Sequence, residues 1–353
     1  MRAVHGHPQG VSLPADDALP PLPPRLQIEV TNRCHLGCTS CARHHWDPVA
    51  NPVGDIAPAT LDALAPLLDA AREVTIGGYG DPTEAPDALV EAVRRAKHAG
   101  CSVRVITGGA KLNAPLLERL ADAGLDRLVL SMDGATDATL RDLRGVSLRA
   151  YLGWIRKARH LAGDGVRPLV QLNVVVQWAN VAELADLVRL GAEEGVAGIH
   201  AFHLKAYTAE TFDRCLLTDP DAARPHFAAA RRAAVRHGVF LALPTLDPAP
   251  QVCTQPYQHL FVRHDGSVRG CCSGLFEPAD HGLVAGALPG TPAAGRLDVR
   301  DPTALWRSPA LQQYRDATRG DGELPRPCRS CAFRLPTLAA HRRPLRVLAP
   351  EVA

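Results

Sequence analysis

Several features are missing from this chain of 353 residues, and each absence excludes a class of protein. No stretch approaches the roughly 18 uninterrupted apolar residues that a membrane-spanning helix needs, and residues 1–24 lack the apolar core of a signal peptide. Neither sign of charge dominates, because 39 Lys and Arg are balanced by 37 Asp and Glu, so binding through bulk charge is not expected. We therefore predict a cytoplasmic protein with a small or neutral substrate, no nucleic-acid partner and no membrane contact.

Disulfides are not expected either, although the chain has ten cysteines. Without an export signal the thiols stay reduced, so cysteines grouped in the sequence favour metal binding. Cys34, Cys38 and Cys41 form the pattern C-x3-C-x2-C directly after a predicted strand. Three thiolates could hold three irons of a 4Fe-4S cube and leave the fourth iron open. A zinc site with its fourth ligand elsewhere, or a buried group of free thiols, is the alternative.

The order of the predicted elements indicates an α/β protein with a parallel sheet. The length allows one large domain with a small appendage. Strands are predicted at 26–31, 74–76, 102–107, 128–132, 169–176, 198–204 and 239–243, and helices at 59–71, 85–99, 114–123, 148–161, 181–194 and 224–237. Six βα units are too few for a closed eight-stranded barrel, and their sites should lie at the C-terminal strand ends. We place a Pro-rich lead-in at 1–25, the α/β domain at 26–243 and a loop-rich domain at 244–353.

Glycines and polar residues follow several of these strands. The sequence Gly-Gly-Tyr-Gly-Asp-Pro-Thr occupies residues 77–83, where glycines let the backbone approach a ligand closely. Hydroxyl, carboxylate, amide and amine groups at other strand ends could bind a ligand, although each is also an ordinary turn or cap residue. The candidate ligand-binding residues are Gly78, Gly80, Asp81, Thr107, Ser131, Asp133, Asn173 and Lys205.

A second group of cysteines lies in the last third of the chain. A β-hairpin with an Asp-Gly turn is predicted at residues 261–270, and it would bring Cys253 and Cys271 together. With Cys328 and Cys331 they could form a four-thiolate site, for which the spacing also permits a zinc ribbon. Cys272, like the isolated Cys215, is left over as either a reactive thiol or a packing residue. The remaining isolated residue, Cys101, is predicted to lie in the core.

The first cysteine pattern, followed one unit later by the glycine-rich stretch, resembles the radical S-adenosylmethionine (SAM) superfamily. The resemblance implies an open partial (βα)6 barrel, a 4Fe-4S cluster on the three cysteines, and SAM bound beside it. Residues 77–83 would correspond to the segment that holds the SAM amino group, with Asp81 at its acidic position. The sequence departs from the pattern at Ser40, where an aromatic residue near the adenine is usual. Trp46 and Trp178 are the candidates to replace it.

The second cysteine group resembles the twitch form of the SPASM extension, which holds one auxiliary 4Fe-4S cluster. The ligands implied are Cys253, Cys271, Cys328 and Cys331. The resemblance further implies a flavodoxin or ferredoxin-type electron donor. It also implies that SAM is cleaved to methionine and a 5′-deoxyadenosyl radical, which removes a hydrogen atom from a substrate carbon.

Members of this size with one auxiliary cluster act on sugars and aminocyclitols in antibiotic biosynthesis. We therefore predict epimerisation of a carbohydrate or aminocyclitol, with Cys272 or Cys215 as hydrogen donor, or dehydrogenation of the same substrate class. Modification of a ribosomal peptide is a further possibility, although residues 1–25 are too short for the leader-binding domain it would normally need. A zinc-stapled binding module without SAM chemistry is the non-enzymatic alternative.

Overall fold

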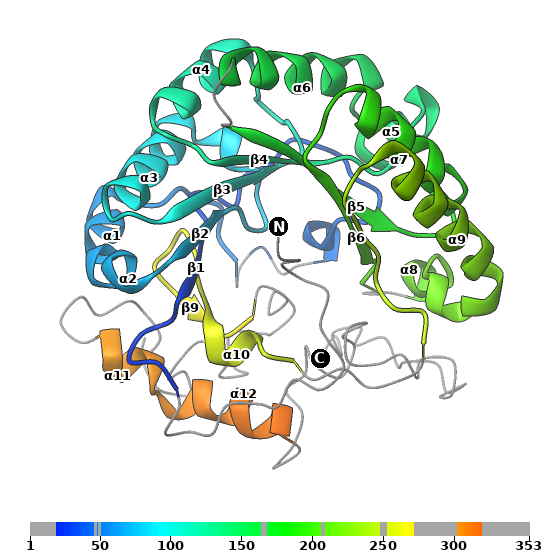
Figure 1. Cartoon of the computed structure of the whole chain (residues 1–353). Helices are drawn as coiled ribbons and strands as arrows, with labels where there is room; N and C mark the ends of the chain where they lie inside the picture. Colours follow the sequence, from blue (N-terminus) through cyan, green and yellow to red (C-terminus); the bar gives the residue numbers. More distant parts are fainter. Residues whose placement is uncertain are drawn as a thin grey trace.

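One continuous β-sheet organises the molecule, with helices along its outer side (Figure 1). The computed structural model describes residues 19–45, 48, 51–163, 168–205, 209–247, 253–271 and 302–319. The sheet has nine strands in the order β7-β6-β5-β4-β3-β2-β1-β8-β9, and all neighbours are parallel except β8 and β9. The strands are β1 (Arg25–Ile28), β2 (Glu73–Ile76), β3 (Ser102–Thr107), β4 (Arg127–Ser131), β5 (Leu169–Val176), β6 (Gly198–His203), β7 (Leu241–Ala242), β8 (His259–Val262) and β9 (Val268–Arg269).

The helices that connect the strands form an arc around the sheet, and three later ones lie beside β8 and β9 (Figure 1). They are α1 (Pro58–Ala63), α2 (Ala65–Ala70), α3 (Pro86–His98), α4 (Ala114–Asp122), α5 (Asp137–Arg144), α6 (Leu148–Ala162), α7 (Leu184–Glu193), α8 (Ala209–Asp213), α9 (Pro220–His237), α10 (Gln255–Gln258), α11 (Pro302–Trp306) and α12 (Pro309–Arg319). None of the helices described combines the length and the apolar content needed to span a bilayer. The α/β class and the mostly parallel sheet are thus confirmed.

The helix prediction for the part of the chain before β5 was wrong at two places, for local reasons. The run predicted as one helix at 59–71 is two short helices, because Pro66 lies in the first turn of α2 and cannot donate a backbone hydrogen bond to the preceding turn. The helix α5 was not predicted at all. Thr136 caps its start by accepting a hydrogen bond from the Thr139 amide, and Gly145 ends it in the left-handed conformation.

The strand β8, which falls within the predicted loop-rich domain at 244–353, pairs with the main sheet. It pairs in parallel with β1, and Arg25 lies in register with His259. The predicted hairpin is confirmed, since β8 and β9 are antiparallel and Gly266 in their turn has a φ of 79°. The extended chain before β1 contacts α11, because the buried Trp306 indole donates a hydrogen bond to the Pro20 carbonyl at 2.9 Å. Two described elements of the last third of the chain are therefore docked near its start, β8 on β1 and α11 on the segment before β1.

The free energy of unfolding should depend on pH through His259, which lies in β8 where this strand pairs with β1. Burial, then the nearby Arg104 and Arg25, lowers the pKa of His259 to about 4, and no described residue forms a hydrogen bond with its Nδ1. The folded state therefore favours the neutral ring, and stability is lost as the pH falls below the unfolded value of about 6.5. Between pH 7.5 and 5.5 we expect a loss of about 1 kcal/mol that is absent from His259→Gln.

Urea denaturation midpoints of both proteins at the two pH values measure this difference. Other titrating groups cancel in the comparison, because they are common to both proteins. An identical pH dependence in the two proteins would contradict the assignment to His259.

Candidate active site

The three early cysteines lie on one loop that leaves the C-terminal end of β1. Their thiols are free and half-buried. Two side chains hold the loop through its carbonyls: Arg43 Nη1 donates to the Cys34 carbonyl at 2.7 Å, and His44 Nε2 lies 3.1 Å from the Cys38 carbonyl. The Cys41 amide also donates to the Cys38 carbonyl at 3.0 Å. The predicted strand-to-loop arrangement of the cysteine motif is thus present.

The electrostatics of this loop show that the thiols are neighbours. Burial, together with the charges of Asp81 and Cys38, raises the pKa of Cys34 to about 11, against the lowering effects of the Leu36 backbone hydrogen bond and of Arg43. Burial also raises the pKa of Cys38, where Cys41 adds to the shift and Arg144 opposes it. The raised pKa values favour the protonated thiols of Cys34 and Cys38, whose protons a metal would have to displace.

The loop fits a three-cysteine iron site by its donor chemistry and by its surroundings. A methyl group added to Gly37, between the first two cysteines, would meet no atom within 4 Å, so the loop borders open space. Among the described side chains no three potential ligands are already arranged as a metal site. The assignment of Cys34, Cys38 and Cys41 as cluster ligands therefore stays a prediction from the motif.

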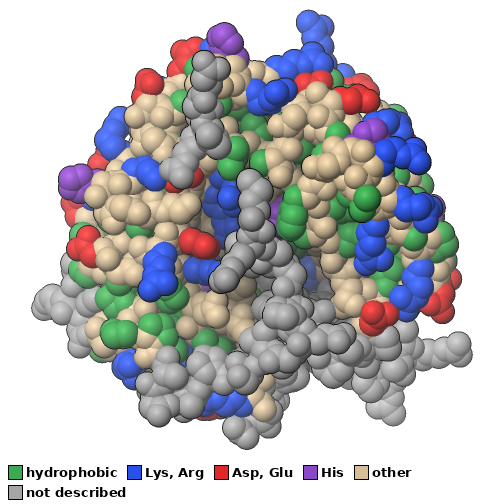
Figure 2. All heavy atoms as spheres, viewed as in Figure 1, with side chains coloured by type: hydrophobic (Ala, Val, Ile, Leu, Met, Phe, Trp, Pro, Cys, Tyr) green, Lys and Arg blue, Asp and Glu red, His purple; other side chains and the backbone are tan. Residues whose placement is uncertain are grey.

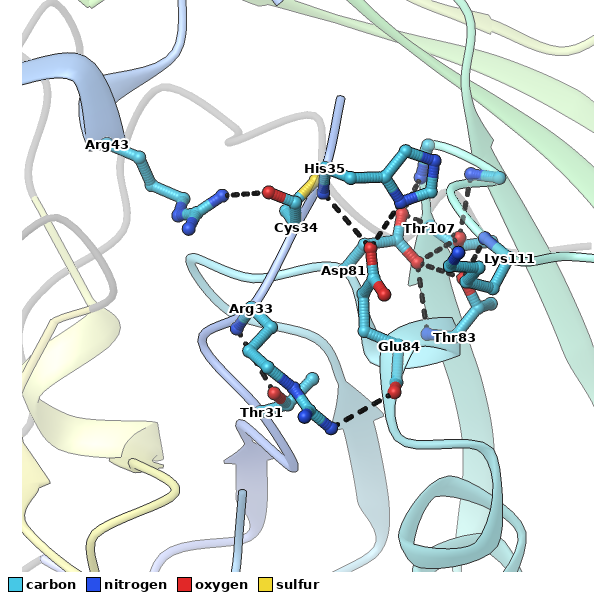
Figure 3. Close-up of polar contacts among 12 residues, drawn as sticks. Thr31, Arg33, Cys34, His35, Arg43, Asp81, Thr83, Glu84, Thr107 and Lys111 are labelled. Atoms are coloured by element: carbon cyan, nitrogen blue, oxygen red, sulfur yellow. Dashed lines mark hydrogen bonds and ion pairs between the residues drawn. The ribbon is translucent and has the colours of Figure 1, made fainter. Parts of the chain in front are cut away.

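Asp81 is the centre of a buried hydrogen-bond network beside this loop (Figure 3). Its Oδ1 accepts from the Thr83 amide at 3.0 Å and from the Thr107 hydroxyl at 2.8 Å, and its Oδ2 accepts from the Gly108 amide at 2.7 Å. These donors join the loop after β2 to the end of β3. The structure thus gives Asp81, and Thr107 with it, a role in shaping the site, while direct contact with the SAM amine stays a prediction.

The glycines after β2 allow two loops to pack together. A methyl group on Gly80 would lie 2.4 Å from the Thr31 carbonyl oxygen and 2.5 Å from that of Arg33. On Gly78 it would lie 2.5 Å from a carboxylate oxygen of Glu29. Side chains are excluded at both positions because chain atoms already occupy the space. The glycine-rich stretch is therefore fixed against the start of the cysteine loop.

The residue that sequence reasoning missed is Arg144, in the last turn of α5. Its Nε donates to Asp133 Oδ2 at 2.7 Å, while Asp133 Oδ1 accepts from the Val175 amide at 2.7 Å. Burial alone would lower the pKa of Arg144, but Asp133, Tyr151 and Cys38 together raise it, so the cation is permanent. The Cys38 thiol donates weakly to the Arg144 carbonyl at 3.9 Å. No motif marks an arginine at this position, because its proximity to the cysteine loop depends on tertiary packing.

The other predicted residues at the strand ends have contacts of their own. The Asn173 side-chain oxygen accepts from Gln171 at 3.0 Å, and the Ser131 carbonyl accepts from the Tyr151 hydroxyl at 2.6 Å. Lys205 is half-buried just after β6. None of these contacts tests a role in ligand binding, so those roles stay predictions.

Cys215 has the contacts of a packing residue. It is buried, and its thiol donates to the Leu204 and Thr211 carbonyls at 3.4 and 3.3 Å. Burial raises its pKa to about 12. These observations weigh against Cys215 as the hydrogen donor. The rival donor Cys272, the predicted ligands Cys328 and Cys331, and Trp46 lie outside the described residues, whereas Cys253 and Cys271 are half-buried on either side of the hairpin.

The chain matches two known domain families. Residues 28–191 match the radical SAM superfamily, and residues 253–332 match SPASM, an iron-sulfur cluster-binding domain. It is 28% identical over 324 residues to a PqqA peptide cyclase of Gluconobacter oxydans, covering 89% of this chain and 84% of that protein. It is also 25% identical over 321 residues to a tungsten-containing aldehyde ferredoxin oxidoreductase cofactor-modifying protein of Pyrococcus furiosus. This match covers 88% of this chain and 87% of that protein.

Two solved structures share the fold over most of the chain. Streptococcus suis SuiB bound to S-adenosylmethionine superposes with a TM-score of 0.63 at 16% identity, over 88% of this chain and 71% of that one. Native anSMEcpe with bound AdoMet superposes with a TM-score of 0.59 at 16% identity, over 88% of this chain and 86% of that one. The sheet, the cysteine loop and the family matches together define a radical SAM enzyme. The chain belongs to the radical SAM superfamily and carries a C-terminal SPASM domain, so its cofactors are SAM and two iron-sulfur clusters.

Proposed function

We propose that this radical SAM enzyme modifies a ribosomally made peptide. The observation that carries the proposal is the similarity to a PqqA peptide cyclase, which extends across both domains and covers 84% of that protein. Similar matches to peptide cyclases of Streptomyces rochei and Methylorubrum populi cover 82% and 78% of those proteins. We therefore rank the peptide first, although the sequence by itself favoured a sugar or aminocyclitol.

The described residues have separate tasks in this proposal. Cys34, Cys38 and Cys41 hold the cluster, and bound SAM supplies the oxidising radical. Arg144, fixed by Asp133, presents a permanent cation beside Cys38, where it can hold a carboxylate. The glycine-rich stretch offers backbone groups at the same edge of the sheet. Figure 2 shows that this face of the molecule is hollowed and that Lys or Arg side chains lie inside the hollow.

Epimerisation or dehydrogenation of a carbohydrate remains the second candidate. It rested on a surplus cysteine as hydrogen donor, and the buried Cys215 has hydrogen-bond contacts that do not suit that role. Only Cys272 retains the possibility, and it lies outside the described residues.

The test is an anaerobic assay of the reconstituted protein with SAM and a reductant. Short peptides encoded beside the gene form one arm, and sugars or aminocyclitols form the other. We expect 5′-deoxyadenosine in amounts that increase only with a peptide, together with a peptide mass lower by two hydrogens, as ring or crosslink formation requires. Mass spectrometry of the peptide and of the nucleoside measures both.

Solvent deuterium separates the remaining outcomes. Incorporation of one deuterium into an unchanged sugar skeleton would establish the epimerase, and a ketone product would establish the dehydrogenase. Either result, with no peptide turned over, overturns the peptide proposal. Nucleoside formed at the same rate without any substrate serves as the background control.

A further inference from the structure

Gln177 carries a buried side-chain amide whose nitrogen finds no acceptor in the part of the chain that the structure describes. The residue follows β5, at the C-terminal edge of the sheet, and its side chain is fully buried. Its Oε1 accepts hydrogen bonds from the Ser40 hydroxyl at 3.3 Å and from Arg214 Nε at 3.1 Å. Its Nε2 is buried and has no hydrogen-bond partner among the described residues. Leaving such a donor unpaired costs about 1–3 kcal/mol, so a partner from outside the chain is favoured.

The orientation of this amide is fixed by its neighbours. Arg214 has only donors, so an exchanged amide would place two donors against each other. Arg214 is itself held, because its Nη2 donates to the Thr39 hydroxyl at 2.9 Å. The backbone of Gln177 is anchored as well, since its amide donates to Asn180 Oδ1 at 2.9 Å. The amide nitrogen must therefore face away from Arg214, where the described part of the chain supplies no acceptor.

This unpaired donor lies beside the cysteine loop, which Arg144 contacts at a different residue. Ser40, which holds the Gln177 oxygen, directly precedes Cys41, whereas Arg144 lies against Cys38. Asn180 joins the two sides, because its Nδ2 donates to the Asp133 carbonyl at 2.8 Å. The cysteine loop is thus contacted by the Arg144 residue at Cys38 and by the oriented Gln177 amide, which Arg214 holds, at Ser40.

We propose that the Gln177 amide donates a hydrogen bond to the nucleoside half of SAM. SAM has a charged amino-acid end and a neutral end that carries the acceptors of adenine and ribose. A cation suits the carboxylate, and a neutral amide donor suits a ring nitrogen or a hydroxyl oxygen. Ser40 and Arg214 act as positioning residues that hold the amide in its orientation. This inference rests on SAM binding as the family defines it, and it does not depend on the peptide proposal.

The test compares SAM with methionine as ligands of the reconstituted protein, by calorimetric titration. Methionine has the amino-acid end of SAM but no nucleoside. Gln177→Glu keeps an oxygen for Ser40 and Arg214. It replaces the amide nitrogen by a second oxygen, which removes the donor and adds a negative charge. We expect the Kd for SAM to rise at least tenfold, with the Kd for methionine changing less than about threefold. The SAM-free melting temperature should stay close to that of the unsubstituted protein, because the new carboxylate gains the charge of Arg214 while one of its buried oxygens is unpaired in place of the amide nitrogen.

Two further variants keep the inference testable. Gln177→Met retains the volume without the amide and should also weaken SAM selectively, even if Gln177→Glu folds poorly. Gln313→Glu, on the exposed face of α12, controls for the added charge and should leave both Kd values unchanged. Equal losses for SAM and methionine would show a general distortion of the site and overturn the assignment. An unchanged Kd for SAM in the Gln177 variants would also overturn the assignment. This holds even if the variants bind the substrate more weakly.

Discussion

Replacing Cys34, Cys38 and Cys41 together by alanine should abolish SAM cleavage and halve the iron content. Two 4Fe-4S clusters correspond to about eight irons per chain, and the variant should retain the roughly four irons of the auxiliary cluster. Thiolates are the only soft donors that this loop offers, and no neighbouring side chain in the described part of the chain completes a substitute site. Iron assay after anaerobic reconstitution, with detection of 5′-deoxyadenosine, measures both effects.

Cys101→Ser is the matched control for this experiment. Cys101 is buried away from the loop, and its thiol donates to the Leu68 and Ala71 carbonyls at 3.3 Å, contacts that a serine hydroxyl can replace. This variant should keep about eight irons and its activity. An alanine triple variant that still binds eight irons, or an unsubstituted protein that takes up zinc and stays colourless, would refute the cluster assignment.

Glu29→Ala should be the most destabilising single substitution in the described part of the chain. Glu29 follows β1 and is fully buried, with Oε2 accepting from Arg263 Nε at 3.2 Å and from His264 Nδ1 at 3.0 Å. Its Oε1 accepts from the Tyr79 amide at 2.7 Å. Removing the carboxylate leaves the buried Arg263 without its counter-charge, which costs about 3–5 kcal/mol. Denaturation midpoints of the reconstituted protein measure the loss.

A double-mutant cycle tests whether the loss comes from this pair. Glu29→Ala combined with Arg263→Met removes both charges, so it should destabilise less than the sum of the two single variants. Asp87→Ala breaks an exposed pair with Arg119 and should leave the midpoint nearly unchanged. Additive effects at Glu29 and Arg263 would contradict the ion-pair explanation.

The same hydrogen-bond network joins β1, the glycine-rich stretch and the hairpin. Glu29 lies at the end of β1, Tyr79 in the glycine-rich stretch, and Arg263 with His264 directly after β8. Arg263 also donates to Asn51 at 3.0 Å. The elements that lead to the two groups of cysteines thus meet at one buried carboxylate, which couples the geometry of the first group to the position of the hairpin.

The local sequence pattern predicted most of the α/β architecture correctly. Strands such as β3 and β5 were predicted at their observed bounds, because apolar runs between turn residues depend only on neighbouring residues. The local pattern did not predict strand pairing between segments that are distant in the sequence. The residues of β8 read as one half of a hairpin, and nothing in them reveals that the other edge of β8 pairs with β1, more than two hundred residues earlier.

In the candidate site, too, local spacing identified the cysteines, whereas contacts between distant segments were not predictable. Cys34, Cys38 and Cys41 were found from the sequence, because three thiols within eight residues already define the chemistry that the family match supports. Asp81 was found too, but its hydrogen bonds to Thr83, Thr107 and Gly108 show it shaping the loops, a role that its position after a strand did not distinguish from ligand binding.

The sequence by itself determined the family, the cofactors and the alternation of strand and helix, because each is encoded in short-range spacing. Only the tertiary structure decided that Arg144 contacts the cysteine loop at Cys38 and Gln177 contacts it at Ser40, that the buried Cys215 thiol donates to backbone carbonyls, and that β8 extends the sheet. The physical reason is that burial, orphaned donors and charge pairing depend on residues that are distant in the sequence and become neighbours only when the chain folds.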